Sequence, residues 1–240
     1  MSLAVTDVPT ADLYGTALHS MNDPDGHRHW YARYEGGPRR SLGEALRRWC
    51  STVDPTDQDL LARAPGAVLD VGCGPGRLVI ELARQGRESA GVDTSRVAVR
   101  LARSAGATAL CRSIFDPVPG EGRWDTVLLA DGNVGIGGDP AMLLARCRDL
   151  IGPTGRVLVE LDPAGTGLRS NRVRLERGTQ RGSWFDWSHV AADAVHGPAA
   201  DAGLCVDQTW ERAGRSFAAL VPASERHRRA VVVPRIGLAS

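Results

Sequence analysis

A glycine-rich segment at residues 68–78 has the residue types and spacing best suited to ligand chemistry. It reads Val-Leu-Asp-Val-Gly-Cys-Gly-Pro-Gly-Arg-Leu. An apolar strand, a glycine-rich turn and a helix in that order form a common nucleotide-binding motif. Glycines let the backbone approach a ligand closely, and the helix N-terminus favours a negative group. The segment therefore predicts a site for a nucleotide-like ligand.

The spacing and charge of this segment argue against a dinucleotide. Gly72, Gly74 and Gly76 follow the pattern G-x-G-x-G, whereas dinucleotide proteins have G-x-G-x-x-G. Asp70 would repel a pyrophosphate but attract an ammonium group. S-adenosylmethionine has an ammonium group, a carboxylate and no phosphate. Asp93 ends the next expected strand and could accept hydrogen bonds from both ribose hydroxyls, although it could also cap the following helix.

The run VLDVGCGPGRL at 68–78, followed by GVDTS at 91–95, closely resembles the first two motifs of class I (Rossmann-like) S-adenosylmethionine-dependent methyltransferases. The order of strands and helices fits that family from about residue 60 to 221. The resemblance implies S-adenosylmethionine as cofactor, with Asp93 on its ribose and Thr94 beside it. It also implies that five residues surround the methionine part: Asp70, Gly72, Cys73, Gly74 and Gly76.

The third motif departs from the family pattern. Members often have a Gly-Asp-Ala type sequence here, whose acid binds the adenine amine, but this chain has Arg-Ser-Ile-Phe-Asp-Pro from residue 112. Ile114 then stands where the acid is expected. We expect Ile114 and Phe115 to flank the adenine ring by apolar contact, with the amine held by backbone, by Ser113 or by Asp116.

The loop after the fourth expected strand contains Asp131 and Asn133. Loops at the carboxyl ends of parallel strands face the ligand crevice, and in this family this loop faces the transferable methyl group. Turn chemistry alone also accounts for an Asp-Gly pair and an Asn. We predict that Asp131 contacts the cofactor and is a candidate general base, and that Asn133 contacts the acceptor.

Histidines outside the glycine-rich segment are further candidates for a general base. His27 and His29 belong to a possible lid, while His189 and His196 follow an expected insertion. An imidazole near the crevice has a suitable pKa for proton removal. Most such histidines are surface or packing residues, and His189 is the one that we single out as catalytic.

Aromatic residues gather in the same two regions. We predict that Trp30, Tyr34 and Trp184 contact the acceptor, with Tyr31 and Trp187 close by. These rings could instead pack the N-terminal region against the sheet.

Strands that alternate with helices must position these residues. Strands are expected at 67–71, 89–93, 107–111, 124–130 and 155–161, with helices at 76–85, 95–104 and 139–150. An antiparallel hairpin is expected at 204–210 and 216–221. This pattern predicts an α/β, Rossmann-like, doubly wound fold whose mainly parallel seven-stranded sheet ends in a C-terminal antiparallel hairpin.

Three further segments complete the expected organisation. Residues 1–60 are interpreted as an N-terminal helical cap or lid, with a short helix at 41–49. The methyltransferase domain spans 61–221 and carries an inserted β-hairpin at 168–186, where apolar and polar residues alternate. Residues 222–240 are interpreted as a tail.

Composition narrows the class of protein. The 240 residues are 42% apolar and 24% charged, as in a globular protein, and the net charge of +1 gives no reason to expect nucleic acid or membrane partners. All 29 basic residues are arginine, so no lysine is available for Schiff-base chemistry, and arginine clusters are weak evidence for phosphate binding. The five cysteines show no zinc-ligand spacing, so no metal is predicted. The start does not resemble a secretion signal, and we expect a cytoplasmic monomer or homodimer.

The function predicted from these features is methyl transfer to an oxygen or nitrogen of a small molecule, such as a secondary metabolite. Three alternatives stay open. A methyltransferase acting on RNA or protein would use the five arginines at 169, 172, 174, 177 and 181 as a basic face. A non-catalytic protein would bind S-adenosylmethionine without turnover. A dinucleotide-dependent oxidoreductase would bind NAD.

Overall fold

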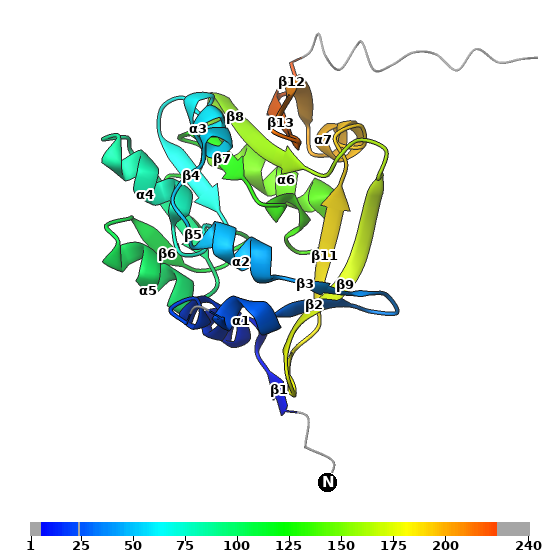
Figure 1. Ribbon diagram of the computed structural model, residues 1–240. Helices are drawn as coiled ribbons and strands as arrows, with labels where there is room; N and C mark the ends of the chain where they lie inside the picture. The colour runs from blue at the N-terminus through cyan, green and yellow to red at the C-terminus, as the bar shows by residue number, and fades with distance from the viewer. Residues whose placement is uncertain (1–5, 24, 225–240) are drawn as a thin grey trace, which may run out of the picture.

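Two β-sheets built from different parts of the chain carry the fold (Figure 1). The computed structural model describes residues 6–23 and 25–224. In the first sheet, five parallel strands are continued at one edge by an antiparallel hairpin. Across the sheet the strands are β12 (Leu204–Arg212), β13 (Arg215–Pro222), β8 (Ile151–Leu161), β7 (Trp124–Leu129), β4 (Val68–Val71), β5 (Ser89–Asp93) and β6 (Ala109–Cys111).

Helices cover both faces of this sheet. They are α3 (Pro55–Ala62), α4 (Arg77–Arg84), α5 (Arg96–Ser104), α6 (Pro140–Leu150) and α7 (His196–Asp201). Leu143 and Leu144 of α6 belong to one apolar core, whereas Leu60 of α3 and Leu82 of α4 belong to another. Local signals begin these helices as expected, because the Ser95 side chain caps α5 and Asp139 with Pro140 opens α6.

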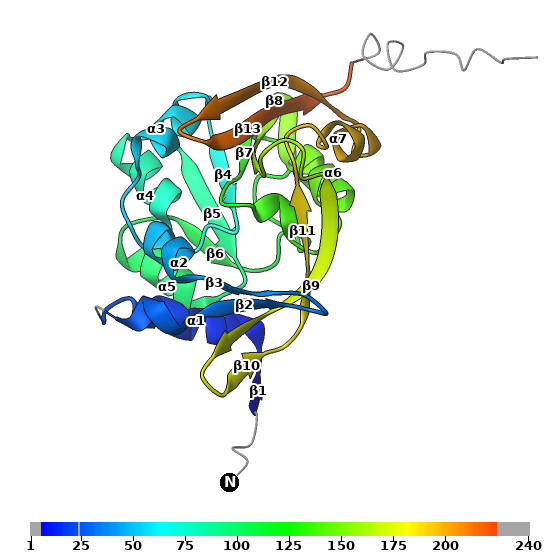
Figure 2. The ribbon, with the colours of Figure 1, turned by 45° about the vertical axis from the view of Figure 1, so that its right-hand side comes forward.

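The second sheet joins the N-terminal region to the insertion. Its main path runs β1 (Thr6–Val8), β10 (Gln180–Gly182), β9 (Leu168–Arg177), β2 (Tyr31–Tyr34) and β3 (Arg39–Ser41), and β11 (Phe185–Val190) also pairs with β9. The long strand β9 therefore holds β2 along its second half and β11 along its first half. Figure 2 shows β1, β2, β3 and β10 of this sheet below the parallel strands, with β9 and β11 rising beside them.

Short helices fill the space between the two sheets. They are α1 (Thr10–Ser20), η1 (Gly26–His29), α2 (Gly43–Trp49) and η2 (Asn133–Gly135). Leu13 and Leu18 of α1 share an apolar core with Leu46 of α2 and Leu175 of β9. The N-terminal region is thus tied to both the insertion and α5.

The sequence predicted the first sheet correctly, including its terminal hairpin, and most strand ends lie within two residues of their expected positions. The N-terminal region is not only helical, because it also supplies β1, β2 and β3. The inserted hairpin is present but continues past residue 186 to Val190. Short strands with partners far along the chain leave little local signal, which explains both differences. From residue 225 onward, the predicted tail lies outside the described residues.

No helix in the described part of the chain is long and apolar enough to cross a membrane.

Candidate active site

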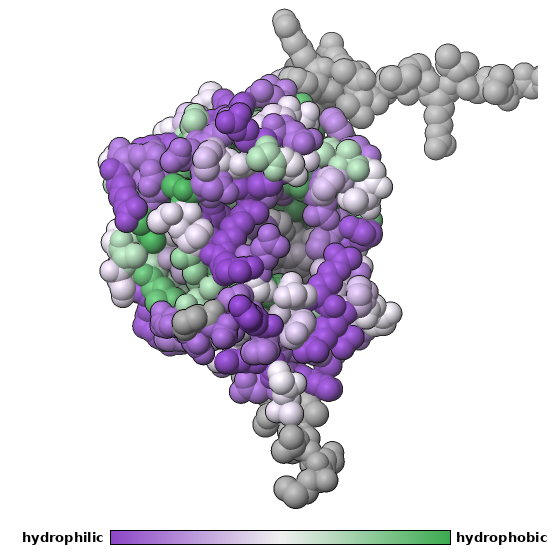
Figure 3. All heavy atoms as spheres, in the orientation of Figure 1, coloured by the Kyte–Doolittle hydropathy of each residue, from purple (hydrophilic) through white to green (hydrophobic). Residues whose placement is uncertain are grey.

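A cavity of about 600 Å³ lies where the carboxyl ends of the parallel strands meet the second sheet. In Figure 3, hydrophilic side chains gather on both sides of the hollow on this face. Of the predicted site residues, twelve line the cavity: Tyr34, Asp70, Gly72, Cys73, Gly74, Asp93, Thr94, Ser113, Ile114, Asp131, Asn133 and His189. Gly76, Phe115, Trp30 and Trp184 are not in its wall. The structure thus brings together most of a site predicted from residues scattered along the chain.

The glycine loop separates into positions with different roles. Gly74 has φ +55°, and a Cβ there would lie 2.9 Å from the hydroxyl oxygen of Tyr14, so a larger residue would close the cavity. Gly76 has φ +95°, and a Cβ there would lie 2.8 Å from Cβ of Ala102 on α5. Gly76 therefore permits close packing of α4 on α5, and its predicted place beside the cofactor stays a prediction.

Asp93 connects the first two motifs through its carboxylate. Oδ2 accepts a hydrogen bond from the Gly74 backbone N–H at 2.9 Å, and Oδ1 accepts one from the Ser95 N–H at 2.7 Å. Burial raises the pKa of Asp93, and these two backbone bonds oppose that rise. A carboxylate oxygen has two lone pairs, so each oxygen can accept a further bond from a hydroxyl in the cavity.

Asp70 is a buried carboxylate that faces the cavity, with 3% of its surface exposed. Burial, reinforced by the charge of Asp131, raises its pKa to about 7. Within the described part of the chain, no hydrogen bond reaches this carboxylate. A positively charged ligand group would pair with the Asp70 carboxylate. This agrees with the ammonium group inferred from the sequence.

Tyr14 on α1 is a site residue that the sequence analysis missed. Its hydroxyl lies above Gly74 and lines the cavity. Burial raises its pKa well above the ordinary value, and Asp93 adds to the rise, so the phenol stays protonated and can donate a hydrogen bond. No local pattern marks Tyr14, since only the packing of α1 on α5 brings it to the loop.

Ser113 and Ile114, which follow β6 and are predicted to contact the adenine, line the cavity. The Ser113 N–H is 3.3 Å from Oδ2 of Asp116, so that carboxylate is engaged in the turn. Phe115 is 39% exposed and its ring lies against Gly137, outside the cavity wall. Phe115 is thus outside the cavity wall although its neighbour Gly137 is part of it, and its contact with an adenine ring stays a prediction.

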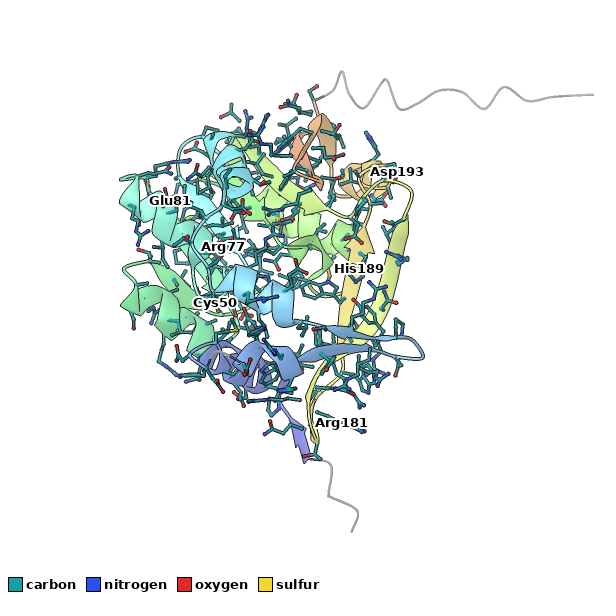
Figure 4. All side chains as sticks on the ribbon, viewed as in Figure 1. Cys50, Arg77, Glu81, Arg181, His189 and Asp193 are labelled. Atoms are coloured by element: carbon teal, nitrogen blue, oxygen red, sulfur yellow. The ribbon has the colours of Figure 1, made fainter. Side chains whose placement is uncertain are left out.

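Arg77, the first residue of α4, is a second site residue that was missed. Its guanidinium forms an ion pair with Asp57 and another with Asp131, at 2.6 Å. Burial lowers the pKa of Arg77, but the two carboxylates outweigh burial and raise it. Figure 4 shows Arg77 and His189 on either side of the cavity that both line.

Glu160 extends these ion pairs beneath the loop after β7. Its Oε2 accepts the Asp131 backbone N–H at 2.7 Å, and both Arg48 and Arg215 pair with its carboxylate. Burial raises the pKa of Glu160 to about 7, although Arg48 lowers it. Arg48 also pairs with Asp131 Oδ1 at 2.9 Å. Asp131 is thus held through its backbone and both carboxylate oxygens.

Asn133 joins the loop after β7 to the glycine loop. Its Nδ2 donates to the carbonyl of Val71 at 2.8 Å and to that of Gly72 at 3.1 Å. Both amide hydrogens are therefore used in hydrogen bonds to backbone carbonyls, and only the amide oxygen is left for a ligand.

Tyr34, His189 and Asp162 form a chain of hydrogen bonds at the far end of the cavity. Tyr34 Oη lies 3.1 Å from His189 Nε2, and His189 Nδ1 lies 3.3 Å from Asp162 Oδ2. The bond from His189 holds the pKa of Asp162 below its ordinary value. Asp162 was missed, although it directly follows β8, a position that faces the crevice in a parallel sheet.

Two of the predicted acceptor contacts are wrong. Trp30 is fully buried in the apolar core that α1 and α2 share with β9, and its Nε1 donates to Ser20 Oγ at 2.9 Å. Trp184 lies under the guanidinium of Arg174, whose Cζ is 4.6 Å from the ring centre. Both rings pack the second sheet, which is the alternative that the sequence had left open.

Together, the doubly wound sheet, the G-x-G-x-G loop and the acid at the end of the second strand define a class I, Rossmann-like methyltransferase. The family model for the methyltransferase domain matches residues 41–207. The chain belongs to this methyltransferase family. No curated protein sequence matches it.

Solved methyltransferase structures share this fold at low sequence identity. A S-adenosylmethionine-dependent methyltransferase from Bacteroides fragilis, in complex with S-adenosylhomocysteine, has a TM-score of 0.73 and 20% identity, over 93% of this chain and all of that one. The CcbJ methyltransferase from Streptomyces caelestis has a TM-score of 0.56 and 16% identity, over 73% and 92%. The 1,6-didemethyltoxoflavin N1-methyltransferase from Burkholderia thailandensis has a TM-score of 0.54 and 17% identity, over 92% and 95%.

The residues of the cavity fit S-adenosylmethionine as the methyl donor. Asp70 offers a buried carboxylate to an ammonium group, and Tyr14 offers a hydroxyl donor above the glycine loop. Asp93 retains lone pairs for hydroxyl groups. Since the donor set matches the charged and polar groups of S-adenosylmethionine, the residues present suit this group.

Replacement of Asp93 tests the ribose position. Asp93→Ala is expected to weaken S-adenosylmethionine binding by about 1–3 kcal/mol, because it removes a charged acceptor of hydrogen bonds. Calorimetric titration measures this loss. Asp93→Asn is the matched variant, since its amide oxygen can still accept one of the two backbone bonds and one ribose hydroxyl. An unchanged affinity in both variants would contradict the ribose assignment.

Proposed function

We propose that the protein transfers a methyl group from S-adenosylmethionine to an oxygen or nitrogen atom of a small molecule. The observation that carries this proposal is the continuity of the cavity, which runs from the glycine loop to Tyr34 and His189. The second sheet closes the cavity on the side away from the glycine loop, and a volume of about 600 Å³ is typical of a small-molecule site. A secondary metabolite would be an acceptor of suitable size.

S-adenosylmethionine supplies an activated methyl group, so the protein chiefly has to align the reactants and exclude water. Asp131 suits the first task, because Arg77, Arg48 and Glu160 fix its position. Both oxygens of its carboxylate are already paired with these two arginines. We therefore assign Asp131 to organising the loop that faces the methyl group and His189 to removing a proton.

The basic face that an RNA or protein substrate would need is partly neutralised. Arg169 pairs with Asp162, Arg172 with Glu35, and Arg174 with Glu176. Exposed arginines that are paired in this way attract a polyanion less strongly than free ones. This arrangement favours a small acceptor, and we expect a cytoplasmic enzyme that acts as a monomer or homodimer.

The test is calorimetric titration with S-adenosylmethionine, S-adenosylhomocysteine and NAD, followed by separate incubations of small-molecule, RNA and protein extracts with methyl-deuterated donor. We expect micromolar binding of the two sulfur ligands, no binding of NAD, and a product that mass spectrometry shows to carry the label. Label transferred only to RNA or protein would contradict a small acceptor. Binding without transfer to any acceptor would support a non-catalytic protein.

A further inference from the structure

We propose that Tyr34, His189 and Asp162 form a proton relay, and that the acceptor is a weak acid of about phenol strength, methylated as its anion on an oxygen or a ring nitrogen. This inference rests on the proposed function and specifies its acceptor. The three residues come from β2, from β11 and from the residue after β8. Tyr34 and His189 both line the cavity.

The direction of the hydrogen bonds follows from the charge of Asp162. Its pKa lies below the ordinary value, chiefly because of the bond from His189, so it is ionised at neutral pH and accepts from His189 Nδ1–H. The proton of a neutral imidazole then resides on Nδ1, and Nε2 accepts from the Tyr34 hydroxyl. The Tyr34 oxygen keeps lone pairs that can accept a proton from a molecule in the cavity.

Two arginines lie close to the relay. Cζ of Arg40 is 5.3 Å from the ring centre of Tyr34, and Nη2 of Arg169 is 3.4 Å from Asp162 Oδ2. Both arginines lower the pKa of Tyr34, whereas burial, the largest effect, and the charge of Asp162 raise it. The arginines would stabilise an oxyanion formed beside Tyr34 and repel an alkylammonium group.

One more charged group lines this part of the cavity. Asp186 lies on β11, and its Oδ1 is 3.9 Å from Arg172 Nε. Its side chain is 68% exposed, so solvent screens its charge at the relay. The pH response of the relay therefore depends mainly on Asp162, Arg40 and Arg169.

The strength of the final base limits the acceptor. An imidazole has an ordinary pKa of about 6.5 and a phenol one of about 10, so a phenol can give up its proton within a catalytic step. An aliphatic alcohol is about as weak an acid as water, whose pKa is about 15.7, and is beyond this relay. Aromatic side chains of Trp49, Phe185 and Trp187 line the same cavity and suit a flat ring.

The proposed step balances in protons and electrons. The acceptor proton passes to the Tyr34 oxygen while the Tyr34 proton passes to His189 Nε2, which gives an imidazolium paired with the Asp162 carboxylate. The acceptor atom uses the electron pair left by its proton to bond the methyl carbon. The electron pair of the broken carbon–sulfur bond stays on sulfur. The imidazolium then returns its extra proton to solvent through Tyr34.

The experiment compares acceptor classes in the wild-type protein. The probes are phenol, 4-nitrophenol, phthalimide as a ring N–H acid, and benzylamine, each incubated with methyl-deuterated S-adenosylmethionine. We expect labelled product from the phenols or phthalimide and none from benzylamine. Methylation of benzylamine alone, or of no probe although S-adenosylmethionine binds, overturns the inference and leaves the proposed function standing. Absence of S-adenosylmethionine binding overturns both.

Variants then test the relay itself. Tyr34→Phe and His189→Ala should lower kcat/KM for a weakly acidic acceptor by about 100-fold or more, the usual contribution of a positioned base. The loss for 4-nitrophenol, already ionised at mildly alkaline pH, should stay below about tenfold. Equal losses on both acceptors would indicate a merely structural role and overturn the relay.

Matched controls are available on the same scaffold. Tyr31→Phe removes a hydroxyl from the same strand, at a ring that lies under Arg39 rather than in the cavity. His196→Ala removes an exposed imidazole from α7. Asp162→Asn tests positioning, because an amide no longer fixes the proton on Nδ1. It should lower kcat with little change in KM and alter the pH profile, whereas an unchanged profile would exclude Asp162 from the relay.

Discussion

Asp70→Asn is expected to stabilise the ligand-free protein at pH 8 and, in the same variant, to weaken S-adenosylmethionine binding. The wild-type carboxyl has a pKa of about 7 in the folded state because it is buried. An unfolded chain has an ordinary value of about 3.9. Between these values the folded state holds a proton that the unfolded state releases, so the free energy of unfolding falls as pH rises from about 4 to about 7.

An asparagine at position 70 does not titrate, so the variant does not lose this part of the free energy of unfolding as pH rises. The shift of about three pKa units corresponds to at most about 4 kcal/mol, and we expect roughly half of that at pH 8. A gain of about 2 kcal/mol should raise the melting temperature by at least about 4 °C for a chain of this size. Glu160 also has a pKa raised to about 7, but it is present in both proteins, so their difference isolates Asp70.

The binding result should have the opposite sign. The ionised carboxylate attracts the ammonium group, so the variant should bind S-adenosylmethionine about 10- to 100-fold more weakly at pH 8. Wild-type affinity should fall by up to about tenfold for each pH unit below 7, whereas the variant should lack this dependence. Asp207→Asn, at an exposed position on β12, is the control for loss of a charge. A variant that melts no higher than wild type at pH 8 would contradict the raised pKa.

Arg77→Met is expected to destabilise the protein by about 3–5 kcal/mol, the usual effect of removing one partner from buried ion pairs. The side chain is 3% exposed, and its loss leaves Asp57 and Asp131 with fewer positive partners. Arg215 still pairs with Asp57 and Arg48 with Asp131, which limits the damage. Urea unfolding monitored by circular dichroism measures the effect.

Two further variants show whether the effect of Arg77→Met comes from the geometry and burial of its ion pairs. Arg77→Lys keeps the charge but cannot direct two arms at two carboxylates, so its loss should be intermediate. Arg28→Met breaks an exposed ion pair with Asp25 and should cost less than about 0.5 kcal/mol. A loss below about 1 kcal/mol for Arg77→Met would show that the charges beneath the loop after β7 hold one another without it.

The parallel sheet and the part of the site assigned to S-adenosylmethionine could be predicted because their sequence signals are local. The segment around Asp70 carries strand, turn and helix signals within eleven residues, Asp93 ends a strand, and Asp131 follows one. The carboxyl ends of parallel strands meet at one edge, so sequence alone brings these residues to one crevice. The structure places all three in the cavity wall.

The acceptor end could not be predicted in the same way. Its wall depends on two pairings of Val173: with Phe185, which is close along the chain, and with Tyr34, which is more than 100 residues away. Trp30 and Trp184 were misassigned because each lies directly before a strand, where no alternation of residues indicates which way the ring faces. The three residues of the relay come from three separate elements, so no spacing in the sequence connects them.

Arg77 was missed for a different reason. The chain uses arginine for every basic residue, which makes any single arginine uninformative. The useful signal was its position at the start of α4. A residue there directly follows the glycine loop and is therefore close to the site. Its role became visible only when α3 brought Asp57 to the same place.

The pairing of β2 with β9 has a consequence for recombination between relatives. An exchange of only one of these segments would set a foreign strand against a native partner and disturb the register that holds Tyr34 and His189. Homologous chimeras should therefore retain acceptor choice only when residues 31–41 and 168–190 are inherited from the same parent. The two segments would behave as a single heritable block, even though more than a hundred codons separate them.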